Sequence, residues 1–477
     1  MLLPVRIPLK TISEANASQR EHWSTKHRRH KAQHREDMVF YAYVKLVSVS
    51  ICKNIIRLIN SLERKFHESR TLLAAPLPKG PCMKHRLVTT TVFFLLSAFG
   101  TGLAYAQLGD VTYALTYLGN PTQGQYADNT DGRYARNMWA VVTYSGKLYL
   151  GNGNANSDGP APNAGPAHAW SFNPATMTFT DEFTMHDYEF QLFRNYNGTA
   201  VIPGINAMAP FLGAFYYHQP GVGWFEKRTV PANTHMFDLI FPLPTPGLLI
   251  AGDGGFDSQG FLRSPVQRAP TNWNTWVDVP CNGGPCPQER FFRFFLLPDG
   301  KYYVNSRNGM YQYDPVAHNL IQLSSATRQA MLPGTSFRVS AVSATFAGGK
   351  AYLAGTNDGG GHLHNEPQYL MWATAPTNVF QFSLPIFGSV PRDTRVLNGK
   401  LYLLSHQDLG GGVFMNYVHS TSDLQTWTEV LRFTTLPGGG IARAFEYLSG
   451  YLYIGLGCYA TPLSNASGWL VRIAYTP

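Results

Sequence analysis

The C-terminal three quarters of the chain alternates short apolar stretches with polar turns, and one arrangement recurs. An apolar stretch leads into a turn that ends in glycine, and a second apolar stretch follows. Turns such as Pro298-Asp299-Gly300 and Asn398-Gly399 are typical of β-hairpins, because glycine accepts a positive φ. The turn glycines lie 49 to 53 residues apart, at Gly146, Gly198, Gly247, Gly300, Gly349, Gly399 and Gly450. Seven near-equal spacings predict seven copies of one structural unit.

Each repeat has room for four strands. In the fourth repeat, Gly309–Tyr313 and Leu320–Leu323 are further candidate strands after the hairpin. Four antiparallel strands in about fifty residues make one blade of a β-propeller. The seventh repeat is one strand short, whereas an extra candidate strand, Val111–Tyr117, stands before the first repeat. We therefore predict an all-β fold, a seven-bladed β-propeller of four-stranded antiparallel blades, closed by an N-terminal strand that completes the last blade.

Several motifs resemble those of kelch-like propellers of the galactose-oxidase type. The resemblance covers most of residues 136–477 and consists of glycine pairs after strands, an aromatic residue before a turn, and tryptophans late in blades. These motifs are Ala251–Gly255, Ala354–Gly360, Tyr313-Asp314-Pro315, Trp224, Trp276 and Trp427. The stretch Ser422–Trp427 also resembles a degraded Asp-box of sialidase-type propellers, with Gln425 where glycine is usual. The resemblance implies how blades are built and leaves the chemistry open.

The N-terminal part of the chain differs in charge and pattern. Residues 1–106 carry 17 of the 38 Lys and Arg but only 6 of the 29 Asp and Glu. Basic Met83–Arg86, uncharged Leu87–Leu103 and Ala104-Tyr105-Ala106 match the three parts of a secretory signal peptide, so we predict a signal peptide over residues 83–106. An uncleaved membrane anchor is the alternative. Residues 1–82 are predicted to be a basic leader, either disordered or upstream of a true start at Met83.

The predicted propeller, residues 107–477, is slightly acidic, so the basic leader gives no evidence for nucleic-acid binding. With 44% hydrophobic and only 14% charged residues, the chain is not disordered overall. We predict a secreted or periplasmic protein with no membrane segment after cleavage. Cys281 and Cys286 are predicted to form a disulfide in that oxidising compartment, with two free thiols as the alternative, and Cys458 is predicted to be buried.

Polar residues recur where the innermost strand of each predicted blade begins. The predicted ligand-binding residues at this channel mouth are Arg136, Asn137, Tyr188, His235, Arg290, Arg338, Arg392 and Arg443. Guanidinium groups that converge on a channel suit a carboxylate, sulfate or phosphate, because each offers a fixed fork of donors. The alternative is that each arginine pairs with a neighbouring carboxylate or carbonyl and fills the channel.

Metal binding and catalysis are two further interpretations of the sequence. In extended chain, His362, His364 and Glu366 would share one face, as Zn²⁺ or another transition metal requires. Loops rich in Asp and Asn leave Ca²⁺ as a further alternative. The H-E-x-x-H and D-x-D-x-D-G patterns are absent, so no cofactor is predicted. The candidate catalytic carboxylates near the channel are Glu189, Asp238 and Asp393.

The function predicted from the sequence is that of a secreted β-propeller binding protein. It would recognise a glycan or another anionic ligand on the channel-mouth face. One alternative is a glycoside hydrolase or polysaccharide lyase that uses a channel carboxylate. Another is a scaffold that docks a protein partner. Propellers host all three classes, so the fold alone does not choose among them, and whether the protein is an enzyme stays open.

Overall fold

The computed structural model describes residues 114–477, except 127–129, 155–163, 197, 209–212, 229, 232–234, 243–246, 357–365, 436–439 and 460–463. The chain divides into two units, Met1–Tyr105 and Ala106–Pro477, and the described residues belong to the second. The predicted leader 1–82 and signal peptide 83–106 lie outside the described residues and stay predictions. None of the helices in the described part has the length and apolar character that a bilayer crossing needs.

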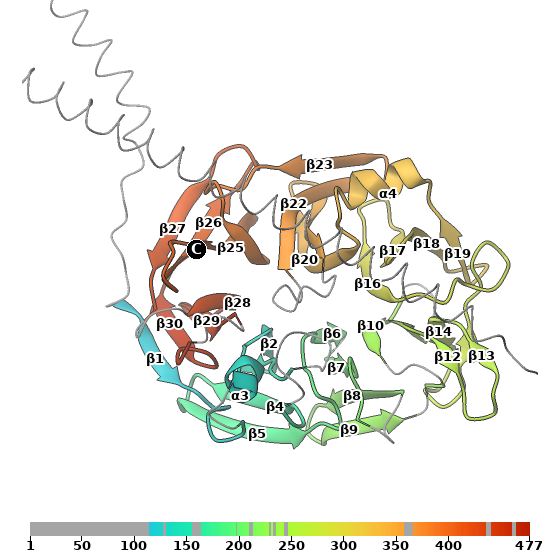
Figure 1. Cartoon of the computed structure of the whole chain (residues 1–477), viewed down its shortest axis with the longest axis horizontal. Helices are drawn as coiled ribbons and strands as arrows, with labels where there is room; N and C mark the ends of the chain where they lie inside the picture. The colour runs from blue at the N-terminus through green and yellow to red at the C-terminus, as the bar shows by residue number, and fades with distance from the viewer. Residues whose placement is uncertain are drawn as a thin grey trace, which may run out of the picture. The chain divides into compact units, whose positions relative to one another are not determined.

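Seven four-stranded antiparallel sheets lie in a ring, with one strand of each sheet nearest the middle (Figure 1). The innermost strands are β2 (Val141–Tyr144), β6 (Arg194–Tyr196), β10 (Met236–Ile240), β16 (Phe291–Leu296), β20 (Arg338–Phe346), β24 (Val390–Leu397) and β28 (Ile441–Leu448). The second strands are β3 (Lys147–Leu150), β7 (Thr199–Pro203), β11 (Leu248–Gly252), β17 (Tyr302–Ser306), β21 (Gly349–Thr356), β25 (Lys400–Asp408) and β29 (Tyr451–Gly457). The predicted seven-bladed propeller is confirmed.

The outer half of each blade follows in the same order around the ring. The third strands are β4 (His168–Asn173), β8 (Ala214–Gln219), β14 (Val266–Ala269), β18 (Met310–Asp314), β22 (Glu366–Ala375), β26 (Phe414–Thr421) and β30 (Leu470–Ala474). The outermost strands are β5 (Thr178–Thr184), β9 (Gly223–Arg228), β15 (Val277–Asp278), β19 (Asn319–Gln322), β23 (Asn378–Phe382), β27 (Thr428–Phe433) and β1 (Thr116–Gly119). In the part of the chain that the structure describes, two short helices, α3 (Thr130–Ala135) and α4 (Ser325–Met331), lie in connections between strands.

The N-terminal strand closes the ring, as predicted. β1 pairs antiparallel with β30, with Thr116 opposite Arg472 and Tyr117 opposite Val471. Leu115 joins the apolar cluster of the last two blades, and the Tyr117 and Trp469 ring centroids lie 5.8 Å apart. This pairing covers an edge of the last blade that would otherwise expose unpaired backbone groups.

Two-residue turns connect several first and second strands. Asn398 and Gly399 have φ values of 48° and 73°, the left-handed pair that matches the twist of a tight hairpin. In the fifth blade this pair is Ala347 and Gly348, so the turn glycine is Gly348 and not the predicted Gly349. Gly349 is needed for a different reason: a Cβ there would fall 2.2 Å from the indole of Trp372.

Two of the motifs, Tyr313-Asp314-Pro315 and the Asp-box-like stretch Ser422–Trp427, lie in turns between third and fourth strands. Asp314 Oδ1 accepts hydrogen bonds from the backbone N–H groups of Val316 (2.8 Å) and Ala317 (3.0 Å). Asp423 Oδ1 accepts them from Gln425 (2.8 Å) and Thr426 (2.7 Å). A side-chain oxygen therefore satisfies backbone donors that the tight turn leaves over.

Apolar side chains fill the spaces between neighbouring blades. One cluster joins Tyr402 and Leu404 of β25 to Leu452 and Ile454 of β29, and the other clusters join further blades in the same way. Tyrosines recur at one place in the second strands, each no more than 2% exposed: Tyr149, Tyr303, Tyr352, Tyr402 and Tyr453. Most of the aromatic content thus builds the ring and is not available to a ligand.

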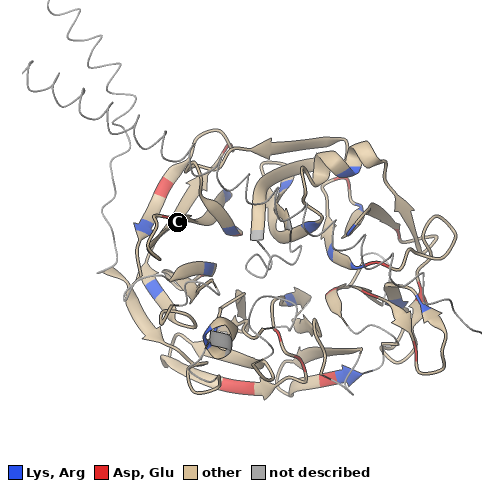
Figure 2. Ribbon diagram, in the orientation of Figure 1, with Lys and Arg blue, Asp and Glu red and all other residues tan. Residues whose placement is uncertain are grey.

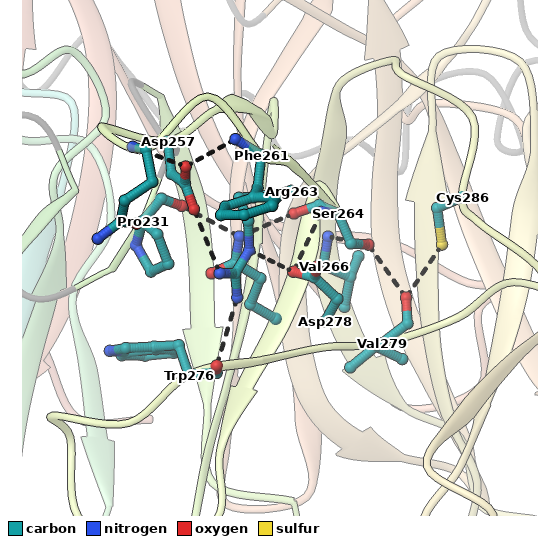
Figure 3. Close-up of polar contacts among 12 residues, drawn as sticks. Pro231, Asp257, Phe261, Arg263, Ser264, Val266, Trp276, Asp278, Val279 and Cys286 are labelled. Atoms are coloured by element: carbon teal, nitrogen blue, oxygen red, sulfur yellow. Dashed lines mark hydrogen bonds and ion pairs between the residues drawn. The ribbon is translucent and has the colours of Figure 1, made fainter.

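The third blade carries an extra hairpin, β12 (Gly255–Phe256) with β13 (Leu262–Arg263) (Figure 3). Arg263 Nε lies 3.1 Å from Asp278 Oδ1, which ties the hairpin to the outermost strand, and Arg263 Nη1 lies 3.5 Å from Asp257 Oδ2 in the turn of the hairpin itself (Figure 3). Nearby, Cys281 and Cys286 form a disulfide with their Cα atoms 4.7 Å apart, and Cys458 is buried.

Candidate functional site: the central channel and its mouth

Bulges near the start of the innermost strands change which side chains line the channel. The register of β24 shifts between Pro391 and Asp393, and that of β28 shifts between Ala442 and Ala444. The extra residues of these two bulges, Arg392 and Arg443, line a central cavity. A bulge re-aims a side chain that strict alternation would place elsewhere. We use "mouth" for the end of the channel at which the innermost strands begin.

On one side of the mouth, two arginines share an aromatic partner. Arg392 Nε donates to His406 Nδ1 (3.1 Å), and Arg392 Nη2 donates to the Tyr459 hydroxyl (2.8 Å). The Arg392 and Arg443 guanidinium carbons each lie 5.4 Å from the Tyr459 ring centroid. Burial, reinforced by the two arginine charges, holds the pKa of His406 well below its usual value. The neutral imidazole can then accept the Arg392 hydrogen bond.

Across the mouth, three phenylalanines form an aromatic belt, which we define as Phe237, Phe292 and Phe337. Ring centroids lie 5.0 Å apart for Phe237 and Phe292 and 5.6 Å apart for Phe292 and Phe337. A guanidinium lies over each ring. The distance from its carbon to the ring centroid is 5.6 Å for Arg290 over Phe237, 5.5 Å for Arg338 over Phe292 and 5.8 Å for Arg307 over Phe337. The ring faces hold these cations in fixed places without neutralising them.

Two of the predicted mouth residues have contacts that tie the chain ends together. Arg136 Nη2 donates to the carbonyl oxygens of Tyr126 (2.9 Å) and Gln123 (3.3 Å), in the segment after β1. Asn137 Oδ1 accepts a hydrogen bond from the backbone N–H of Cys458 (2.6 Å), which joins the first blade to the last. Both side chains are buried in these contacts.

Two other predicted mouth residues have different surroundings. His235 stacks on Phe237, with ring centroids 5.9 Å apart, and its Nδ1 lies 2.5 Å from Asp253 Oδ2. Tyr188 is half-buried, and its carbonyl accepts the backbone N–H of Asn154 (2.8 Å). The structure therefore brings together His235, Arg290 and Arg338 on one side of the mouth.

Asp238, a candidate catalytic carboxylate, joins three blades. Its Oδ1 accepts from Arg194 Nε (2.7 Å) and its Oδ2 accepts from the backbone N–H of Phe294 (2.7 Å). Arg194 belongs to β6 and Phe294 to β16, on either side of the Asp238 strand β10. Asp238 is fully buried, and this geometry is that of a structural cross-link.

Asp393 and Glu189 are also engaged. Asp393 Oδ1 accepts from Arg395 Nη1 (2.7 Å), and its Oδ2 accepts the backbone N–H of Phe445 in the next blade (3.2 Å). Burial raises the pKa of Asp393 even though the Arg395 charge opposes the shift. Glu189 is fully buried, and Gln191 Nε2 donates to its Oε1. Gln191 Oε1 in turn accepts from Arg338 Nη2 (3.3 Å), so Glu189 is connected to the mouth.

The candidate metal ligands His362 and His364 lie outside the described residues, while Glu366 begins β22. Within the ranges that the structure describes, no group of three His, Cys, Asp or Glu side chains is arranged to hold a metal ion. The metal interpretation therefore stays a prediction about a segment that the structure does not describe.

Below the mouth, the innermost strands enclose a cavity of about 370 Å³. Its charged lining residues are Arg194, Arg293, Arg392, Arg395, Arg443, Asp393 and Glu446. Basic positions on innermost strands around the hub can be followed in Figure 2. The sequence analysis missed Arg194, which begins β6, and it missed Arg293 and Arg395, which lie farther along their strands. One signal was available, because Arg293 interrupts the apolar run Phe291–Phe295.

A scan against protein-family models and a search of curated proteins found no match. Solved structures resemble the fold at a distance. One, YCF48 bound to D1 peptide, is 12% identical with a TM-score of 0.44, over 76% of this chain and 97% of that one. A chain of a mitotic checkpoint complex is 8% identical with a TM-score of 0.44, over 84% and 98% of the two chains. These likenesses are too distant to carry an argument about what this chain binds.

Proposed function

We propose that this protein binds an acidic glycan or a similar anionic ligand at the channel mouth. The observation that carries the proposal is the row of guanidinium groups held over the aromatic belt. Arg290 is half-buried and Arg307 is exposed, and among the described residues neither side chain has a carboxylate within ion-pair distance. A guanidinium fixed by a ring face keeps its donors available, so an oxyanion from solution can complete the site.

The proposal includes export of the protein to a secreted or periplasmic location. The Met83–Ala106 pattern and the Cys281–Cys286 disulfide both support it, because disulfides persist in oxidising compartments. Sequencing the N-terminus of the purified extracellular protein should find a first residue at or near Gln107. Retention of the intact chain inside the cell would contradict this part of the proposal.

The mouth can be tested by removing two charges from the belt. Arg290→Ala combined with Arg307→Ala should weaken binding of a polygalacturonate oligomer at least tenfold in calorimetry, because two oxyanion contacts are lost. A neutral glucan should not bind either protein. Raising the salt concentration should weaken wild-type binding more than it weakens the residual binding of the variant.

The matched control removes the same charge elsewhere. Lys301 and Lys400 are exposed and lie at the first hairpins, at the other end of the innermost strands. Lys301→Ala combined with Lys400→Ala should leave the dissociation constant unchanged. If both double variants lost affinity for the oligomer equally, binding would depend only on net charge. If the Arg290 and Arg307 variant bound the oligomer as tightly as the wild type, the mouth site would be refuted.

A further inference from the structure

Four side chains on one side of the cavity have buried hydrogen-bonding atoms that are unused. We define them as the polar wall: Arg293 of β16, Ser340 and Ser343 of β20, and Thr394 of β24. Among the described residues, no partner exists for Arg293 Nη1, Ser340 Oγ, Ser343 Oγ or Thr394 Oγ1. Buried polar atoms are nearly always satisfied in native proteins, so four unsatisfied atoms on side chains that line one cavity indicate an occupant that accepts hydrogen bonds.

Arg293 is the cation of the polar wall. Its side chain is only 6% exposed, and burial lowers its pKa to about 10, so it still carries its charge at neutral pH. Asp238, whose charge lies near enough to raise that pKa, is already bonded to Arg194 through both oxygens. Arg293 therefore keeps a charged, directional donor for something other than Asp238.

The backbone around Arg293 is held in place by one buried amide. Asn305 Oδ1 accepts from the backbone N–H groups of Arg293 (3.4 Å) and Val339 (3.3 Å), and its Nδ2 donates to the Phe337 carbonyl (2.7 Å). These bonds fix β16 against β20, the two strands that carry Arg293 and the two serines. The wall is thus positioned before any ligand arrives, which reduces the entropy lost on binding.

The other lining charges include two carboxylates. Asp393 Oδ1 lies 2.7 Å from Arg395 Nη1, and Glu446 Oε2 lies 3.3 Å from Arg395 Nε. An ionised carboxylate has about four acceptor positions, so each can also accept a hydrogen bond from a hydroxyl group. The cavity therefore offers a guanidinium and three hydroxyls to an anion, and carboxylates to hydroxyl donors.

We propose that the central cavity binds one sugar-acid unit, with its carboxylate on Arg293 and the hydroxyls of the polar wall, and its own hydroxyls toward Asp393 and Glu446. This inference rests on the proposed function, since the unit would be part of the acidic ligand held at the mouth. Arg392 and Arg443 line both the mouth and the cavity, which makes the two sites continuous. A cavity of about 370 Å³ is in the size range of small-molecule sites.

The test uses free galacturonate, galactose and a galacturonate oligomer as separate probes in calorimetry. Galacturonate should bind the wild type, and Arg293→Met should weaken that binding at least tenfold. Galactose, which lacks the carboxylate, should not bind. Ser340→Ala combined with Ser343→Ala is the second variant, and it should weaken galacturonate binding severalfold even if Arg293→Met fails to fold.

The two sites fail in distinguishable ways. The mouth variant with Arg290→Ala and Arg307→Ala should lose affinity for the oligomer and keep its affinity for free galacturonate. The cavity proposal would be overturned if galacturonate binding survived both Arg293→Met and the serine variant, or if the wild type did not bind galacturonate at all. In either case, binding of the oligomer would still test the mouth site separately. Equal binding of inorganic sulfate and galacturonate would also overturn the cavity proposal, because the hydroxyl contacts would then contribute nothing.

Discussion

Arg194 and Arg293 line the same cavity from two innermost strands, and their surroundings are opposite. Arg194 is bonded to both oxygens of Asp238 and to the Phe294 carbonyl (2.9 Å). Burial lowers its pKa, but the charges of Asp238 and Tyr196 and the hydrogen bonds to both side chains together outweigh burial, and the net shift is upward. For Arg293, burial prevails and the pKa falls to about 10. The same residue type, lining the same cavity, is fully partnered in one case and not in the other.

The difference shows how to assign a role to a buried charge. A buried charge costs free energy unless hydrogen bonds and an opposite charge compensate it. Arg194 meets that condition within the fold, so it acts as part of the ring. Arg293 does not meet it within the described residues, so compensation is left to an occupant of the cavity. The internal pairing that the sequence analysis considered for the mouth arginines is found at Arg194 and Arg395, and within the described residues it is not found at Arg293.

The largest effect should come from breaking the compensated pair. Asp238→Asn keeps the shape of the side chain but leaves Arg194 buried without its counter-charge. Loss of one partner of a buried ion pair costs about 3–5 kcal/mol, so the free energy of unfolding should fall by that amount in denaturant titrations.

A second substitution isolates the pair from other effects of the mutation. Arg194→Met in the Asp238→Asn background removes the orphaned cation, and it should restore part of the lost stability. If Asp238→Asn costs less than about 1 kcal/mol, the pair is not a cross-link of the ring, and the contrast with Arg293 loses its meaning.

The ring was predictable because its signals are local. A hairpin turn needs residues that accept positive φ at two adjacent positions, and Asn398-Gly399 satisfies this within the sequence itself. The closing strand followed from counting, because the seventh repeat lacked one strand and β1 supplies it. Only the exact turn position in the fifth blade was misplaced, where Gly348 and Gly349 stand side by side.

The channel lining was less predictable because bulges break the alternation of side chains. After the extra residue Arg392, a strand read with a strict period of two assigns each following residue to the wrong face. Partners far along the chain were also out of reach. Neither the tie from Arg136 to the Tyr126 carbonyl nor the pairing of Arg194 with Asp238, 44 residues away, leaves a local signal.

A buried carboxylate that has no cation within ion-pair distance among the described residues extends the comparison to acids. Asp187 is fully buried and accepts from the Tyr216 hydroxyl (2.7 Å) and the Asn206 backbone N–H (2.9 Å). Burial raises the pKa of Asp187 to about 8. Asp187 therefore stays protonated in the folded protein at pH values where it is ionised in the unfolded chain, whose Asp pKa is about 4. The stabilisation that Asp187 contributes is complete below pH 4 and is lost as the pH rises to 8.

The matched variant is Asp187→Asn, which resembles the neutral acid and does not titrate. The difference in unfolding free energy between wild type and variant should change by about 1.4 kcal/mol per pH unit between pH 5 and 7, and level off above pH 8. Denaturant titrations at several pH values measure that slope. A constant difference across this range would show that Asp187 is ionised in the folded protein. Hydrogen bonds from neutral groups would then be enough to stabilise a buried carboxylate.

The smallest effect, and the most informative sign, should come from Arg293→Met. Methionine matches the arginine side chain in length as far as Nε and removes the buried cation that has no partner for its Nη1 among the described residues. In buffer without ligand, the variant should be as stable as the wild type or about 1 kcal/mol more stable, because nothing compensating is lost. The measurement is the same denaturant titration, with Arg290→Met as the control at a half-buried site.

The sign of this change separates the two roles that a buried arginine can have. If Arg293→Met lost about 3 kcal/mol, as expected for Arg194, then Arg293 would be compensated inside the fold and the cavity would have no unsatisfied cation. If the variant is stable but no longer binds galacturonate, Arg293 lowers the stability of the ligand-free protein and stabilises the complex. Stability and binding would then change in opposite directions at one side chain, which a purely structural residue does not do.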